Sequence, residues 1–317
     1  MLNKLRKNRF VKSILRTILL CLLGTFILFL LVQTLPGDAA TRFVGKVEPE
    51  ALELIRERMG LNQPPLLRYW YWLKNLLGGS FGTTMTTDLP VSDVIRLPFR
   101  ATLIVSGFVL VGVVFVTLPL AIYEGAQMHP RRHILSKLSL MPAAMPEFVV
   151  AILLLAVLAQ GAGWLPVLSI PKPGASLWDS PQIFVLPVLS LWLIVSANLF
   201  RRVAALVRTY ASSAYVRDAR LAGMSEWRVI FVHLLPSAAY GIGQLLALTV
   251  PYLLGGAVVV ETVFSFPGMG YLLVQSINSR ETTVVMAIGL IQILYTAVGL
   301  WLADIAGAKN ERISQVV

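Results

Sequence analysis

The chain has 317 residues, of which 56% are hydrophobic and 14% charged, and its mean hydropathy is +0.75. These values exclude an ordinary soluble domain and indicate a polytopic membrane protein. The formal net charge of +11 would suit a nucleic-acid-binding protein only if the basic residues formed one surface. A single cysteine, Cys21, excludes an intrachain disulfide and a cysteine metal cluster.

Six apolar stretches are long enough to cross a bilayer. They lie at residues 14–34, 101–124, 136–160, 184–206, 239–261 and 283–306. The basic segment before the first stretch resembles the start of a signal peptide, but the stretch is too long and no small-residue cleavage site follows it. We therefore expect an uncleaved first helix and an all-α protein with six transmembrane helices.

The basic residues gather on one side of these spans. They are the N-terminal lysines and arginines, Arg131, Arg132, Lys137, Arg201, Arg202, Arg208, Arg217, Arg220, Arg228, Lys309 and Arg312. The short connectors of the other side carry only Lys172 and Arg280. The positive-inside rule then predicts that residues 1–13, 207–238 and 307–317 are cytoplasmic. The charge therefore indicates membrane topology and contact with anionic lipid headgroups, not nucleic-acid binding.

The long extracytoplasmic segment at residues 35–99 contains signals for local structure. Pro49 to Met59 predicts a helix that ends at Gly60, and residues 66–77 predict a second, interfacial helix. A glycine-rich turn follows at 78–83, and another helix begins after Pro90. This segment could simply cap the bundle, or it could receive an extracytoplasmic partner.

A polar segment between the fourth and fifth spans predicts two short helices. Good helix formers up to Ala222 are stopped by Gly223, for which we expect a left-handed conformation that a larger residue would disturb by clashing. Ser225 can cap a second helix that ends before Pro236. Tyr215, Ala219 and Ala222 recur at helical spacing and would form a flat face. Such a face suits docking of another protein, although an ordinary connector is the alternative.

Two carboxylates are the main candidates for the solute pathway or its gate, because ionisable residues within membrane spans are often functional. Glu147 lies inside the third span between Pro146 and Phe148, where it could contact solute or join two helices through an ion pair or hydrogen bond. Glu261 ends the fifth span and could hold the loop that follows. The three histidines are scattered, so the sequence predicts no metal site and no catalytic constellation.

Five motifs in order carry a resemblance to a known family. They are Leu35-Pro36-Gly37-Asp38, Met59-Gly60-Leu61-Asn62-Gln63-Pro64 with Gly79-Ser80-Phe81-Gly82, Pro98-Phe99-Arg100-Ala101-Thr102-Leu103, Tyr215 to Gly223, and Glu261-Thr262-Val263-Phe264-Ser265-Phe266-Pro267-Gly268-Met269-Gly270. With these motifs the chain resembles the membrane permease subunits of ATP-binding-cassette (ABC) importers, in the dipeptide, oligopeptide and nickel branch.

The resemblance implies a type I importer permease fold, with residues 100–306 as its core and 207–238 as a cytoplasmic coupling loop. It assigns ATPase coupling to Tyr215, Arg217, Asp218, Ala219, Arg220 and Gly223, with Trp227 as a buttress beneath them. The implied partners are a second, homologous permease, two ABC ATPases and an extracytoplasmic substrate-binding protein in the bacterial cytoplasmic membrane. Asp218 replaces a threonine usual in this branch, and Leu221-Ala222 replaces Ala-Lys.

The chain lacks a G-x-x-x-x-G-K-[ST] phosphate loop, so ATP and magnesium are expected in the partner ATPases. We expect a translocation subunit without catalytic activity of its own. A secondary transporter that needs no ATPase is the alternative, but it would leave the coupling loop unexplained. The resemblance leaves the cargo open among peptides, nickel, metal chelates and related small solutes.

Overall fold

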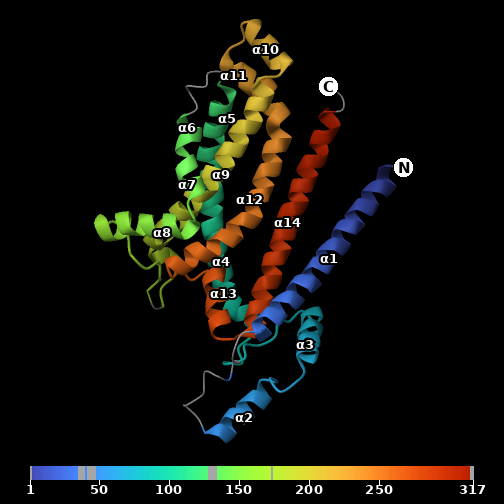
Figure 1. Ribbon diagram of the computed structural model, residues 1–317, viewed down its shortest axis with the longest axis vertical. Coiled ribbons are helices and arrows are strands. Elements are labelled where there is room, and N and C mark those ends of the chain that lie inside the picture. The colour runs from blue at the N-terminus through green and yellow to red at the C-terminus, as the bar shows by residue number, and fades with distance from the viewer. Residues whose placement is uncertain (1, 35–39, 41–47, 128–133, 173, 315–317) are drawn as a thin grey trace. The chain divides into compact units, whose positions relative to one another are not determined.

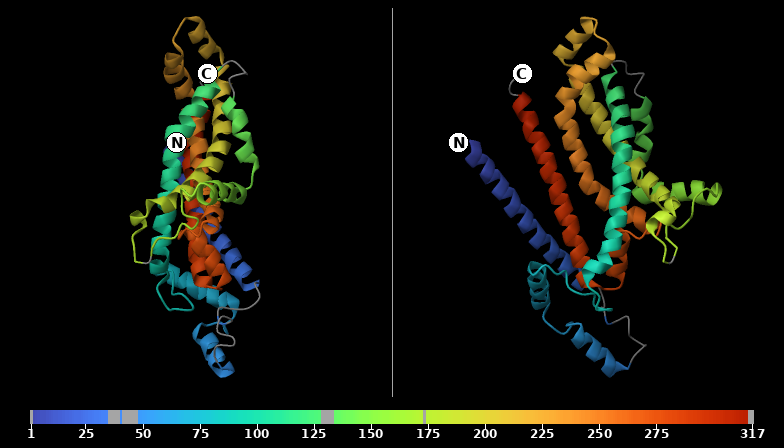
Figure 2. Two further views of the ribbon diagram at one scale, coloured as in Figure 1. Left: turned by 90° about the vertical axis from the view of Figure 1, so that its left-hand side faces the viewer. Right: turned by 180° about the vertical axis from the view of Figure 1, so that it is seen from behind.

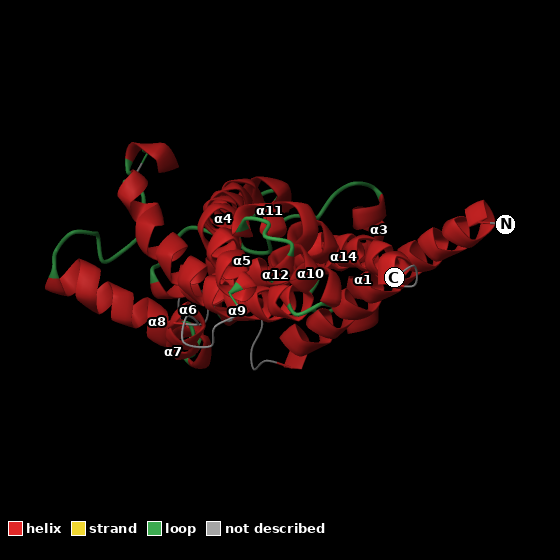
Figure 3. Cartoon of the chain, turned by 90° about the horizontal axis from the view of Figure 1, so that it is seen from above, coloured by secondary structure: helices red, strands yellow, loops and turns green. Residues whose placement is uncertain are grey.

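A computed structural model describes residues 2–34, 40, 48–127, 134–172 and 174–314, with side chains for those between 15 and 304. The described residues are almost entirely helical and contain no strand beyond one bridge between Thr83 and Pro90, as Figure 3 shows. The expected all-α class is confirmed. The predicted turn at 35–38 and the basic pair Arg131 and Arg132 lie outside the described residues.

The chain divides into two compact units. The first comprises Met1–Thr102 and Pro267–Ala297, and the second comprises Leu103–Phe266 and Val298–Val317. Two long helices, α4 (Val91–Gly112) and α14 (Thr282–Ser314), contribute residues to both units.

The first unit also contains four complete helices. These are α1 (Leu2–Thr34), α2 (Pro49–Arg58), α3 (Pro65–Leu77) and α13 (Met269–Asn278). The helices predicted at 49–59 and 66–77 are confirmed, whereas α13 was not predicted. On α3, Trp72 is buried against α1 and α14 while Trp70 is exposed, so one face of this helix packs on the protein.

Glu281, just before α14, holds the loop that precedes α4. Its side chain is only 6% exposed, and its carboxylate accepts hydrogen bonds from the backbone N–H groups of Met85 (2.7 Å) and Thr86 (3.1 Å) and from the Thr86 hydroxyl. A buried carboxylate needs such donors. Loop residues nearly 200 positions earlier in the chain are thereby held at the start of α14.

The second unit is built around α9 (Val185–Ala211), which packs against both α5 and α12. Its other helices are α5 (Leu118–Ala126), α6 (Ile134–Leu138), α7 (Leu140–Ala144), α8 (Glu147–Leu154), α10 (Ala214–Leu221), α11 (Glu226–Arg228) and α12 (Leu235–Val263). Most residues of α9 that face its neighbours are apolar and buried. Figure 1 shows α10 and α11 beyond the end of α9.

Among the residues that the structure describes, five helical segments are long and apolar enough to cross a membrane. They are Leu15–Thr34, Val91–Ala126, Pro181–Ala211, Glu226–Val263 and Thr282–Asp304. Segments Ile134–Ala144 and Glu147–Gly161, bent by 101°, make a sixth if they are counted as one span. The break falls at Met145 and Pro146, where extended backbone interrupts the expected straight helix at 136–160.

The second span begins ten residues earlier than the predicted 101. It starts at Val91, passes Pro98 without ending, and joins α5 through a π-helical turn at Val113–Thr117. Asp93, Arg96 and Arg100 lower the hydropathy of its first turns, so the apolar signal starts only after them. The helix itself is longer than its membrane-compatible part.

Gly125 permits the close approach of α5 and α9, and its replacement tests this packing. A Cβ there would lie 2.7 Å from the Ala204 carbonyl oxygen and 2.8 Å from the Val207 Cβ, whereas a Cβ at Gly107 on α4 meets nothing within 4 Å. We expect Gly125→Ala to lower the stability of the purified protein by about 1–3 kcal/mol. Gly107→Ala, the matched control, should be neutral or stabilising because alanine favours helices. Thermal unfolding in detergent measures both, and equal midpoints would contradict this packing.

Candidate functional site

The coupling segment, defined here as residues 211–235, connects α9 to α12 in the second unit. It forms a small helical knob at one end of these helices, visible in all three ribbon views (Figures 1 and 2). It contains α10, a turn and α11, followed by a π-helical turn at Val229–Leu234.

Gly223 ends α10 in the expected left-handed conformation, with φ +79°. The Met224 N–H bonds the Ala219 carbonyl (3.3 Å) and the Gly223 N–H bonds the Arg220 carbonyl (3.0 Å), which is the Schellman arrangement. A Cβ at Gly223 would meet no surrounding atom within 4 Å, so a side chain there would be strained by the left-handed backbone and not by packing against neighbouring elements.

The sequence predicted that the second short helix ends before Pro236, and this prediction is wrong. From Glu226 the chain remains helical through the π turn into α12, forming one run to Val263. Pro236 is the second residue of α12, where a missing N–H is tolerated, and the wider π turn precedes it. Ser225 occupies the N-cap position of α11, but its side chain makes no capping hydrogen bond.

A small apolar cluster holds the two arms of the coupling segment together. Val216 and Ala219 from α10 pack with Val229 beyond α11, and Met224 from the turn packs against them. Val216 and Val229 are fully buried, and Ala219 is 7% exposed. Ala219 therefore faces the inside of the segment, and the expectation that it forms part of an open flat face is wrong.

Arg220 is the polar tie of the coupling segment. Its guanidinium donates to the carbonyl oxygens of Ala126 (2.9 Å) and Ala211 (3.3 Å), which are the last residues of α5 and α9. It also pairs with Glu226 on α11 at 3.1 Å. Helix-end carbonyls lack partners within their own helix and carry partial negative charge, so a cation is well placed there. Arg220 thus joins four helices from inside the segment.

The outer surface of the segment mixes charged and apolar side chains. Arg217 and Asp218 are exposed, and so are Tyr215, Leu221 and Trp227. The Tyr215 hydroxyl donates to the Ser237 hydroxyl at 2.7 Å. Leu221 is 86% exposed, a feature that sequence reasoning missed because leucine at this position fits an ordinary amphipathic pattern.

Trp227 does not act as a buttress beneath α10. It is 65% exposed and stacks on Phe231, with ring centroids 5.9 Å apart. The place beneath α10 is filled by the cluster around Val216 and Val229. The two aromatic rings instead extend the apolar part of the outer surface.

Glu147 stands at the break of the third span, as the first residue of α8. Its carboxylate accepts a hydrogen bond from the Tyr252 hydroxyl on α12. A Cβ at Gly256 would lie 3.2 Å from a Glu147 carboxylate oxygen, so the glycine leaves room for this group. The hydrogen bond between helices, one of the two alternatives for Glu147, is present, and contact with the solute stays a prediction.

Glu261 is completely buried near the end of α12. Its main-chain carbonyl accepts the Phe266 N–H at 2.8 Å, and Phe264 and Phe266 are fully buried beside it. Ser265 adopts a positive φ of 52°, which turns the chain between the two rings. The Glu261 main chain thus joins the turn after α12, while support of the loop by its side chain and a role as gate stay predictions.

Comparison with known proteins identifies the family. Residues 117–312 match the family described as binding-protein-dependent transport system inner membrane component, and residues 7–96 match the corresponding N-terminal family. The chain belongs to this family of transport permeases. It is 32% identical over 282 residues to the glutathione transport system permease protein GsiC of Escherichia coli K12, covering 88% of this chain and 90% of the relative. The Salmonella choleraesuis protein of the same name is 31% identical over 283 residues.

The permease is therefore a multi-pass membrane subunit of an ABC importer, as the motifs predicted. Membership of a binding-protein-dependent family excludes the alternative of a secondary transporter. The family match covers the coupling segment and both carboxylate candidates, Glu147 and Glu261.

The structural role of the Arg220 hydrogen bonds can be tested by comparing alanine variants of Arg220 and of its exposed neighbour Arg217. Arg220→Ala would leave two helix-end carbonyls without their donor, at a cost of about 1–3 kcal/mol. We expect backbone amides of residues 211–235 to exchange roughly ten to a hundredfold faster in this variant, measured by hydrogen exchange on the purified permease. Arg217→Ala removes the same charge from α10 and should leave exchange unchanged. The tie would be disproved if both variants exchanged alike.

Proposed function

We propose that this permease forms one half of a membrane pathway that imports peptides and related small solutes. The second half would be a homologous but distinct permease, because the described part of the chain supplies one set of five or six membrane-compatible segments. Two ABC ATPases would drive transport from the cytoplasm, and an extracytoplasmic binding protein would deliver the solute. The family description, which makes transport dependent on a binding protein, supports this assembly.

The coupling segment is the observation that carries the proposal. An ATPase that pulls on a permease needs a part that moves without deforming. Here the Val216–Val229 cluster holds the two arms of the segment together, and hydrogen bonds from Arg220 and Tyr215 fix it to α5, α9 and α12. We propose that Tyr215, Arg217, Asp218 and Trp227 contact the ATPase, joined by Leu221. Ala219, Arg220 and Gly223 would act indirectly, by holding the shape of that surface.

The chain is proposed to bind neither nucleotide nor metal itself. Its sequence lacks a phosphate loop, so ATP and magnesium would be held by the partner ATPases. Peptides are favoured as cargo because relatives sharing 31–32% identity are named for glutathione transport, and glutathione is itself a short peptide. The binding protein would make most of the selection among solutes.

Vesicle transport tests this function directly. The permease is purified alone and with its proposed partners, reconstituted with ATP inside, and supplied with binding protein and labelled di- and tripeptides outside. We expect ATP-driven peptide uptake only when the permease is reconstituted with all of its proposed partners, and none with the permease alone. Leu221→Asp should weaken uptake several-fold by placing a carboxylate on the apolar part of the docking surface, while Leu221→Met, which keeps an apolar side chain at the same exposed position, serves as the control. ATP hydrolysis or uptake by the lone chain would contradict the proposal.

The proposed orientation places both termini and the coupling segment in the cytoplasm and residues 35–99 outside. Trp70 and Leu221 are 60% and 86% exposed and suit labelling. In a Cys21→Ser background, Trp70→Cys should react with an impermeant maleimide on intact cells. Leu221→Cys should react only after the membrane is opened. Reaction of both from the same side would overturn this topology.

A further inference from the structure

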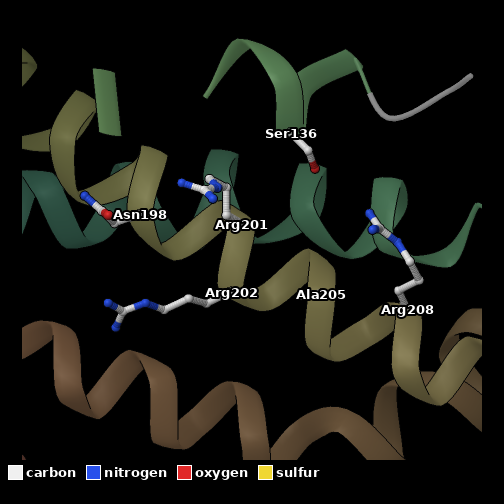
Figure 4. A pocket seen from close by; sticks show the side chains of 6 residues that line it. All are labelled: Ser136, Asn198, Arg201, Arg202, Ala205 and Arg208. Carbon is white, nitrogen blue, oxygen red and sulfur yellow. The ribbon is translucent and has the colours of Figure 1, made fainter. Parts of the chain in front are cut away.

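An arginine-lined pocket lies on α9 of the second unit, apart from the coupling segment surface. It has a volume of about 500 Å³ and is lined by Ser136, Asn198, Arg201, Arg202, Ala205 and Arg208 (Figure 4). All but Ser136 belong to α9, and Ser136 comes from α6. The function described above does not use this pocket.

Helix geometry explains why these residues share a pocket. Asn198, Arg201, Ala205 and Arg208 follow one another at intervals of three or four residues, which places them along one face of α9. Figure 4 shows Arg201 and Arg208 both extending toward α5 and α6, where Ser136 lies. Ala205 stands between them with a short side chain. It leaves space between the two guanidiniums.

The lining offers cationic and polar groups without any carboxylate. Within the described part of the chain, Arg201, Arg202 and Arg208 form no ion pair. Glu124 reaches the same region but does not line the pocket. Its carboxylate is 2% exposed and accepts hydrogen bonds from the N–H groups of Leu135 (2.8 Å) and Ser136 (2.9 Å) and from the Ser136 hydroxyl. Glu124 thus holds α6 in place as one wall of the pocket. Because its carboxylate is bonded to α6, the guanidinium groups of the pocket can bind an anion.

The position of the pocket along α9, relative to the bilayer, indicates which kind of anion can reach it. Arg201 lies 20 residues after Pro181, the first residue of the fourth span, so about 30 Å of helix separates them. That length equals the hydrocarbon thickness of a bilayer, roughly 30 Å. Arg201 to Arg208 therefore fall at the level of lipid headgroups, at the end of α9 that leads into the coupling segment.

We propose that this pocket binds the phosphate headgroup of an anionic phospholipid. Guanidinium groups match phosphate oxygens in charge and in planar, two-point hydrogen bonding. Basic pockets between membrane helices at headgroup depth have the right chemistry for such lipids. Bound there, the lipid phosphate would join α9 to α6 and offset the repulsion among the three arginines.

Lipid retention tests the site. The full importer is reconstituted in nanodiscs of neutral phosphatidylcholine containing a small fraction of phosphatidylglycerol, then transferred to detergent, and the bound phosphatidylglycerol is counted by native mass spectrometry. We expect Arg201→Gln with Arg208→Gln to weaken retention about twenty-five-fold, since each arginine near headgroups contributes about fivefold. Arg201→Lys with Arg208→Lys should retain an intermediate amount because charge remains without the planar geometry.

Arg228→Gln is the matched control, because it removes an exposed arginine of the coupling segment outside the pocket. Its lipid retention should equal that of the unchanged protein, and all variants are compared only when they assemble with their partners. Equal retention in the double glutamine variant and the control would overturn the proposal. Inorganic phosphate at millimolar concentration should displace little lipid. Strong binding of phosphate without lipid retention would also overturn it, in favour of a soluble phosphate ligand.

Discussion

The hydrogen bonds of Arg220 to the ends of α5 and α9 are the constraint on which the shape of the coupling segment depends. Two long membrane helices end with carbonyl groups that need donors, and one guanidinium from α10 supplies them at Ala126 and Ala211. The same side chain reaches Glu226 on the other arm. We propose that a movement of the coupling segment is passed to α5 and α9 through these charge-assisted hydrogen bonds. The apolar cluster around Val216 contributes non-directional packing, whereas Arg220 contributes directional hydrogen bonds.

The second unit has its broken span away from this junction. The third span is broken at Pro146, and the Glu147–Tyr252 hydrogen bond joins the start of α8 to α12 across that break. The loop after α12 is held by buried Phe264 and Phe266 and by the Glu261 carbonyl. Rigid transmission at one end and interrupted helices elsewhere suit a pathway that must alternate its access.

Much of this architecture was predictable from the sequence, because bilayer thickness and hydropathy determine where spans lie. The helices at 49–58 and 65–77 and the left-handed Gly223 followed from proline and glycine chemistry. The broken third span was not predicted, since hydropathy is insensitive to one proline. Nor was the inward role of Arg220, because its partner Ala126 lies 94 residues away and contributes only a main-chain oxygen. Ala219 was expected on the outer face and Trp227 beneath α10, but Ala219 is buried and Trp227 is exposed. The reason is that Val216 and Val229, not tryptophan, fill the inside of the segment.

A distance measurement within the second unit tests the central claim, that the coupling segment moves as one body with α9. Spin labels at Arg228→Cys and Thr209→Cys, both exposed positions outside the proposed ATPase contacts, are introduced in a Cys21→Ser permease assembled with its ATPases. Double electron–electron resonance then compares the nucleotide-free and ATP-bound complexes. The account predicts the same single, narrow distance distribution in both states. A shifted or broadened distribution with ATP would contradict rigid transmission through Arg220.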